Sequence, residues 1–110
     1  MNLRPLRPRH LAEPLGFIRK MNYIIFDLEA TCWEGRNIGQ NETIEIGAVL
    51  INEEKELVST FEQFIKPLKN PILSDFCKEL TSINQESIDS APYFDVAIER
   101  FKSWINSNEQ

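Results

Sequence analysis

The sequence carries two closely spaced carboxylates, Asp27 and Glu29, at the end of a short apolar segment. In a β-strand, residues two positions apart project from the same face, so both side chains would point one way. Neighbouring carboxylates repel each other and lose hydration, and a hard cation such as Mg²⁺ or Mn²⁺ relieves both penalties. The pair is therefore a candidate metal site. The alternative is a chance Asp-x-Glu pair on a solvated strand end.

A third carboxylate, Glu45, lies between Ile44 and Ile46 in a second apolar segment, where an unpaired charge would be costly. If this segment pairs beside the first, Glu45 is expected to support or join the same site. The alternative is that Glu45 faces solvent on a half-exposed sheet.

The strands that would position these carboxylates can be predicted from hydrophobic periodicity. Residues 23–28 and 57–65 are rich in β-branched and aromatic residues, and residues 43–51 carry apolar or small residues on both faces. We expect both faces of the middle strand to be largely covered. The polar stretch 52–56 is typical of a hairpin turn, so the three strands are predicted to form an antiparallel meander.

The second half of the chain is predicted to be helical. Ser74 and Asn84 are expected to cap two short helices, because apolar residues recur after each at helical spacing. After Pro92, a longer helix is indicated by one apolar stripe: Phe94, Ala97, Ile98, Phe101, Trp104 and Ile105.

Composition limits the class of protein. The 110 residues are the size of one small domain, and no apolar run is long enough to cross a bilayer. The two cysteines form no CxxC pair, which favours a reducing compartment such as the cytoplasm. Residues 1–20 hold five basic groups and one acidic group, and are interpreted as a flexible basic leader. The rest is acidic, which argues against a passive phosphate-binding surface.

Several segments together resemble one known family. The run Ile-Phe-Asp-Leu-Glu-Ala-Thr-Cys at 25–32 resembles the first motif of the DEDDh 3′–5′ exonucleases, especially the histone-mRNA and siRNA-trimming branch. Ile-Glu-Ile-Gly-Ala-Val at 44–49 resembles that family's second strand. Phe-Ile-Lys-Pro at 64–67, followed by residues 73–83, is similar to its strand-to-helix passage. The similarity continues through 91–94 and covers about residues 22–105.

The resemblance implies an α/β, ribonuclease-H-like fold and the removal of nucleotides from the 3′ end of single-stranded nucleic acid, with RNA favoured over DNA. It implies two divalent metals, Mg²⁺ or Mn²⁺, with Asp27 bridging both and Glu29 binding one. It also implies two segments near the terminal nucleotide, formed by Ala30, Thr31 and Cys32 and by Leu80, Thr81 and Ile83.

The family pattern further requires a second aspartate and a His-x-x-x-x-Asp segment, and the sequence contains neither in the matching place. The single histidine, His10, lies in the leader, and Asp89 and Asp95 are explained more simply by a polar turn and a helix start. We therefore expect residues 21–110 to form the N-terminal part of an exonuclease domain: an incomplete fold, with a three-strand meander and two or three helices, inactive alone.

The alternative function is a short non-catalytic module that binds nucleic acid or another protein. Half a sheet should leave an open edge, which favours self-association, and no membrane partner is expected. Phe101, Trp104 and Ile105 are expected to lack some of their packing partners.

Overall fold

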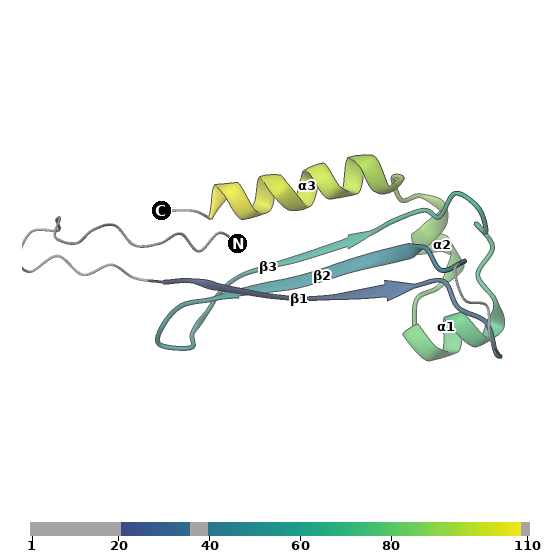
Figure 1. Cartoon of the computed structure of the whole chain (residues 1–110), viewed down its shortest axis with the longest axis horizontal. Helices are drawn as coiled ribbons and strands as arrows, with labels where there is room; N and C mark the ends of the chain where they lie inside the picture. The colour runs from purple at the N-terminus through teal and green to yellow at the C-terminus, as the bar shows by residue number, and fades with distance from the viewer. Residues whose placement is uncertain (1–20, 36–39, 109–110) are drawn as a thin grey trace, which may run out of the picture.

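The structure of the chain, a computed structural model, describes residues 21–35 and 40–108. The predicted leader, including His10, lies outside the described residues, as does part of the loop that follows the first strand. The elements follow in the order β1 (Tyr23–Ala30), β2 (Thr43–Ile51), β3 (Leu57–Phe64), α1 (Asp75–Thr81), α2 (Gln85–Asp89) and α3 (Phe94–Ser107) (Figure 1). Each element predicted from the periodicity is therefore present. β1 runs two residues further than expected, so Glu29 lies within the strand.

The three strands form the predicted antiparallel meander, in the order β1-β2-β3. The register places Glu29 opposite Glu45, and Asp27 opposite Gly47. The β2–β3 turn is held by Asn52, whose side-chain Oδ1 accepts the backbone N–H groups of Glu54 and Glu56, each at 2.9 Å. This short connection fixes the register that brings the acidic residues of different strands together.

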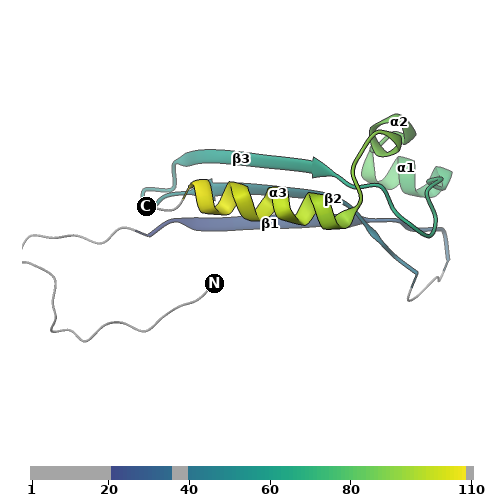
Figure 2. The same cartoon turned by 90° about the horizontal axis from the view of Figure 1, so that it is seen from above.

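One face of the sheet is covered by α3, which lies along the strands (Figures 1 and 2). Ile46 and Ile65 pack against Ala97 of the helix in a buried core. Phe101 lies 5.3 Å from Phe61 and 6.0 Å from Trp104, measured between ring centroids. The aromatic side chain of β3 lies directly beneath this helix, so Phe101 and Trp104 have partners in the described chain, although both stay half-buried, as does Ile105.

A second core lies at the end of the sheet, where α1 and α2 pack. It contains Ile44, Leu73, Cys77, Ile83 and Ile88. Both predicted caps are confirmed: the Ser74 Oγ accepts the Cys77 N–H at 2.9 Å, and the Asn84 Oδ1 accepts the Ser87 N–H at 2.8 Å. This core anchors the segment after β1 and the segment before α1 to the same place.

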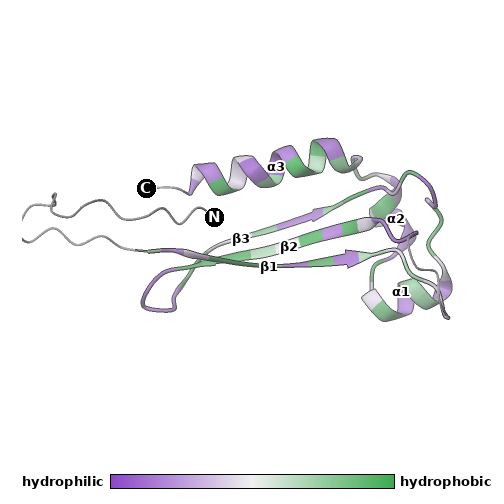
Figure 3. Ribbon diagram, viewed as in Figure 1, coloured by the Kyte–Doolittle hydropathy of each residue, from purple (hydrophilic) through white to green (hydrophobic). Residues whose placement is uncertain are grey.

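The opposite face of the sheet, here called the open face, is only partly covered in the described part of the chain. Along β2, buried residues on the helix side alternate with half-buried ones on the open side, and Figure 3 shows hydrophobic residues along the strand. No residue of β2 is exposed, so the expectation that both faces of this strand are largely covered is confirmed, although all three described helices pack on the helix side or at the sheet end (Figure 1). None of the described helices is long and apolar enough to cross a membrane.

Candidate functional site

Asp27 and Glu29 project from the open face of β1, as their spacing predicts. Strand alternation places Tyr23 and Ile25 on this face and Phe26 on the helix side, where its ring lies 5.9 Å from that of Phe101. The Asp27 side chain is exposed and Glu29 is half-buried. The pairing of β1 with β2 therefore places both carboxylates on the open face.

Glu45 joins these carboxylates across the sheet. It lies opposite Glu29, so the expected pairing of the first two strands is confirmed. Burial raises the pKa of Glu45 to about 7, helped by a hydrogen bond with Glu62 and by the negative charges of Glu62, Glu29 and Asp27. We call these four residues the carboxylate cluster. Glu45 can therefore hold a proton near neutral pH.

Glu62 was missed by the sequence reasoning. It lies on β3 opposite Gly47, which is in turn opposite Asp27. Alternation alone did not reveal it, because the face that Glu62 occupies depends on a register shift between Leu50 and Ile51 in the pairing of β2 with β3. Gly47 leaves room between the flanking carboxylates, because a Cβ built there would meet nothing within 4 Å.

The cluster has the donor chemistry that a hard divalent cation requires. All of its side chains offer carboxylate oxygens, and a cation would offset the burial and the repulsion that together raise the pKa of Glu45. Among residues 21–35 and 40–108, however, no three His, Cys, Asp or Glu side chains gather closely enough to hold one ion. Asp27 and Glu29 therefore offer a hard divalent cation only part of a ligand set.

The first predicted substrate segment, Ala30 to Cys32, is tied into the fold. Thr31 is 2% exposed, and its backbone N–H donates to the Glu42 carbonyl at 2.8 Å. The Thr31 Oγ1 accepts the Glu42 N–H at 2.9 Å, and its carbonyl accepts the Asn41 Nδ2 at 2.6 Å. The Thr31 hydroxyl thus holds the loop in place.

The second predicted segment, at the end of α1, divides between surface and core. Leu80 is 66% exposed, whereas Ile83 is buried in the core against which Cys32 packs. The Thr81 hydroxyl donates to the Cys77 carbonyl at 2.8 Å. The structure therefore brings the two predicted segments together at one end of the sheet, with Leu80 offering the exposed apolar surface.

The two aspartates considered as replacements have local partners. The Asp89 Oδ1 accepts the Gln85 Nε2 at 2.9 Å at the end of α2, and Asp95 lies in the first turn of α3. Both are surface positions that helix formation explains, as the sequence indicated.

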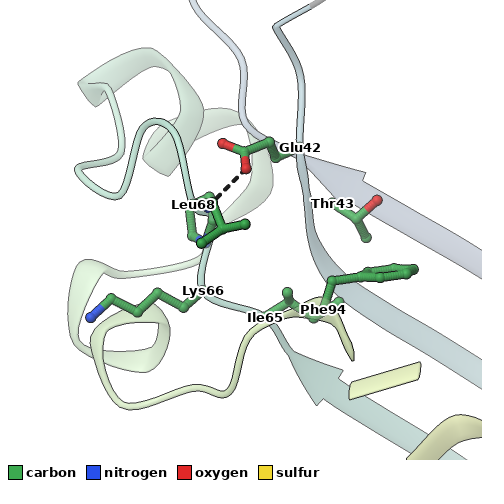
Figure 4. A pocket seen from close by; sticks show the side chains of 7 residues that line it. Glu42, Thr43, Ile65, Lys66, Leu68 and Phe94 are labelled. Atoms are coloured by element: carbon green, nitrogen blue, oxygen red, sulfur yellow. Dashed lines mark hydrogen bonds between the residues drawn. The ribbon is translucent and has the colours of Figure 1, made fainter. Parts of the chain in front are cut away.

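A pocket of about 260 Å³ lies beside the cluster's strands, and no predicted site residue lines it (Figure 4). Its wall includes Ile65, Leu68 and Phe94. The Glu42 carboxylate accepts the backbone N–H groups of Leu68, Lys69 and Asn70 at 2.8 to 3.2 Å. Glu42 therefore connects the loop after β3 to the Thr31 segment.

Comparison with known proteins gives one family match. The family model described as Exonuclease (RNase_T) matches residues 24–110. The chain is 43% identical over 83 residues to ERI1 exoribonuclease 2 of Xenopus laevis, covering 74% of this chain and 12% of that relative. It is 42% identical over 78 residues to the 3′-5′ exonuclease eri1 of Schizosaccharomyces pombe, covering 69% of this chain and 26% of the relative.

Two solved structures are similar over most of the described chain. The nuclease domain of 3′hExo bound to rAMP, a DEDDh family member, aligns with a TM-score of 0.77 and 37% identity. The alignment covers 81% of this chain and 46% of that one. A structure that shows 3′-end specific recognition of the histone mRNA stem-loop by 3′-exonuclease aligns with a TM-score of 0.76 and 36% identity. This alignment covers 81% of this chain and 40% of that one. The chain thus spans less than half the length of each of these relatives.

Proposed function

The chain belongs to the exonuclease family whose model matches residues 24–110, and on that premise we propose that it supplies metal-binding carboxylates to a 3′–5′ exonuclease. The observation that carries the proposal is the position of Asp27 and Glu29, which lie side by side on the open face of β1 and oppose Glu45 across the sheet. The remaining metal ligands and the general base are expected to come from residues other than Asp27, Glu29 and Glu45.

Asp27 and Glu29 would hold divalent cations, Mg²⁺ or Mn²⁺. When bound, such cations would help to deprotonate an attacking water and stabilise the oxygen that leaves the cleaved phosphodiester. Asp27 would contact both ions and Glu29 one, with Glu45 supporting them from the neighbouring strand. The fold's own contribution is to fix these carboxylates by pairing β1 with β2 in one register.

RNA is the favoured substrate over DNA. This preference rests on the names of the similar proteins, which include exoribonucleases, and on neighbours whose titles mention rAMP and a histone mRNA stem-loop. The segments Ala30 to Cys32 and Leu80 to Ile83 would lie near the terminal nucleotide. Of these, Leu80 has the exposed apolar surface that a base can stack against or contact.

The first test is trimming of a single-stranded RNA labelled at its 5′ end, with Mn²⁺ present. We expect the 110-residue chain alone to show little or no trimming. The carboxylates of a two-metal site act as a unit with a general base, and the sequence has no His-x-x-x-x-Asp segment that would supply one. Robust trimming that Asp27→Ala abolishes would contradict the expected inactivity, and would mean that other residues complete the site.

The second test measures Mn²⁺ binding by calorimetry. We expect weak uptake by the wild-type chain and its loss in the Asp27→Asn, Glu29→Gln double variant. Asp95→Asn is the matched control, since it removes a carboxylate from the start of α3. Equal uptake by all three proteins would refute the metal role of Asp27 and Glu29.

A second candidate function is a non-catalytic module that associates with itself or another chain. The supporting observation is that β1 is an edge strand of the described sheet and exposes Ile25, Phe26 and Leu28, each about half-exposed. Sedimentation velocity should then show concentration-dependent association that Ile25→Lys reduces. A monomer at all concentrations would exclude self-association. We also propose the cytoplasm as the location, because the sequence has only two cysteines and no CxxC pair, which favours a reducing compartment.

A further inference from the structure

Two cysteines that are far apart in the sequence meet at the end of the sheet. Cys77 lies on α1 and is completely buried, whereas Cys32, which follows β1, is half-buried. Cys32 packs against the core that contains Cys77. Both residues are free thiols in the structure. Neither has a part in the proposed metal site.

Ser74 holds the backbones of the two cysteines together. Its Oγ donates to the Cys32 carbonyl at 2.7 Å and accepts the Cys77 N–H at 2.9 Å. The Cys77 Sγ also donates to the carbonyl of Ala30, two residues before Cys32, at 3.7 Å. The Cys77 side chain is therefore directed toward the segment that carries Cys32.

We propose that Cys32 and Cys77 are a dithiol site that a peroxide converts into a reversible intramolecular disulfide. The Cys32 thiolate attacks one peroxide oxygen, the O–O bond breaks, and a sulfenic acid and the first water are produced. The Cys77 sulfur then attacks the Cys32 sulfur, the S–O bond breaks, and the second water leaves. Two electrons pass from the thiols to hydrogen peroxide, and the proton of each thiol ends in water.

The different burial of the two thiols determines this order. Cys32 is the one that an oxidant in solution can reach, and the buried Cys77 has Cys32 as its neighbouring thiol. Burial raises the pKa of Cys32 to about 11, with further contributions from Cys77 and Glu29, so few molecules carry the reactive thiolate at neutral pH. Slow oxidation by excess peroxide is expected.

The disulfide would link the segment from Ala30 to Cys32 to α1, the helix that ends at Thr81. These are the two segments that the proposed function places near the terminal nucleotide. The proposal does not depend on the exonuclease function, because it concerns thiol positions that can be tested without RNA or metal.

The experiment treats the 110-residue chain with hydrogen peroxide, blocks remaining thiols with iodoacetamide and maps tryptic peptides without reduction. We expect one linked pair, the peptide with Cys32 joined to the peptide with Cys77, and both thiols lost together. Dithiothreitol should restore them. The oxidised chain should also melt higher, by on the order of 10 °C, because a cross-link restricts the unfolded chain.

Two variants keep the test decisive. Cys32→Ser is expected to fold and to form no linked peptide, leaving the Cys77 thiol intact until the protein is denatured. Cys77→Ala should leave Cys32 as a sulfenic acid that a dimedone probe captures. In the folded wild-type chain, Cys32 oxidised alone, disulfide dimers between chains, or two thiols that both survive excess peroxide would each overturn the proposal.

Discussion

The two faces of the sheet differ in what their side chains do. On the helix side, aromatic and aliphatic residues pack under α3, and Ile46 is 2% exposed. On the open face, the four carboxylates of the cluster lie on three adjacent strands near Gly47, and Ile25 is 57% exposed. In β2, therefore, every second residue is buried on the helix side and contributes to stability, and the residues between them lie on the open face with the carboxylate cluster.

The difference shows how a short chain can carry a destabilising acidic site. Carboxylates that repel one another reduce the free energy of unfolding, and packing elsewhere has to offset that loss. The alternation of a strand keeps the two effects on opposite faces, so that Asp27 and Phe26 are neighbours in sequence but contact different groups. Substitutions on each face should separate stability from metal binding.

The largest expected effect comes from Ile46→Ala. Removing this buried side chain should lower the free energy of unfolding by about 2–4 kcal/mol, since transfer and cavity costs add. Ile25→Ala makes the same chemical change on the open face, where it should alter stability by about 0.5 kcal/mol or less. Urea denaturation followed by circular dichroism measures both. Similar losses for the two variants would show that the open face is covered in solution.

The helix-side packing was readable from the sequence because its pattern is local. The spacing of Phe94, Ala97, Phe101 and Trp104 predicted the helix and its apolar face, and both short helices begin at the predicted caps, Ser74 and Asn84. The sequence did not indicate which residues pack against that face of α3, because contacts between α3 and β3 depend on how the chain returns over the sheet. The contact of Phe101 and Trp104 with Phe61 was not anticipated for that reason.

The next effect in size is the pH dependence that Glu45 gives to the chain without metal. Its pKa is raised from 4.5 to about 7 on folding, so the folded state binds more protons than the unfolded state between these values. Stability should therefore fall as pH rises through this window. Above pH 7, Glu45→Gln should be more stable than the wild type by about 1–2 kcal/mol, allowing for partial solvent screening.

This difference is measured by urea denaturation at pH 5 and pH 8 in EDTA. Glu45→Gln should lose the pH slope between these values that the wild type shows. Glu54→Gln, which changes an exposed residue within the hairpin turn, is the matched control and should retain the wild-type slope. If wild type and Glu45→Gln have the same slope, Glu45 is not in a crowded acidic environment. Saturating Mn²⁺ should reduce the difference in the free energy of unfolding between the wild type and Glu45→Gln.

The candidate site was predictable in part. Asp27 and Glu29 follow from two-residue spacing in a strand, and Glu45 follows if the strands are neighbours. Glu62 requires the exact pairing of β2 with β3, which depends on the five-residue polar turn and on a register shift near Ile51. The contact between Cys32 and Cys77 was not foreseen, because nothing in the local pattern indicates that α1 folds back onto the segment after β1.

The smallest effect concerns a polar contact on the helix side. The Trp104 Nε1 donates to the Ser59 Oγ at 2.9 Å, joining α3 to β3 beside the aromatic packing. Ser59→Ala should cost about 1 kcal/mol, because it leaves a half-buried indole N–H without this acceptor. Trp104→Phe removes the donor together with some packing, so only a double-mutant cycle isolates the bond. Urea denaturation of both single variants and the double variant should give a coupling of about 0.5–1 kcal/mol. Strict additivity would mean that this hydrogen bond adds nothing to the packing of α3 on the sheet, and the contact between Arg100 and Gln63, at 3.1 Å, would be the next polar link between α3 and β3 to test.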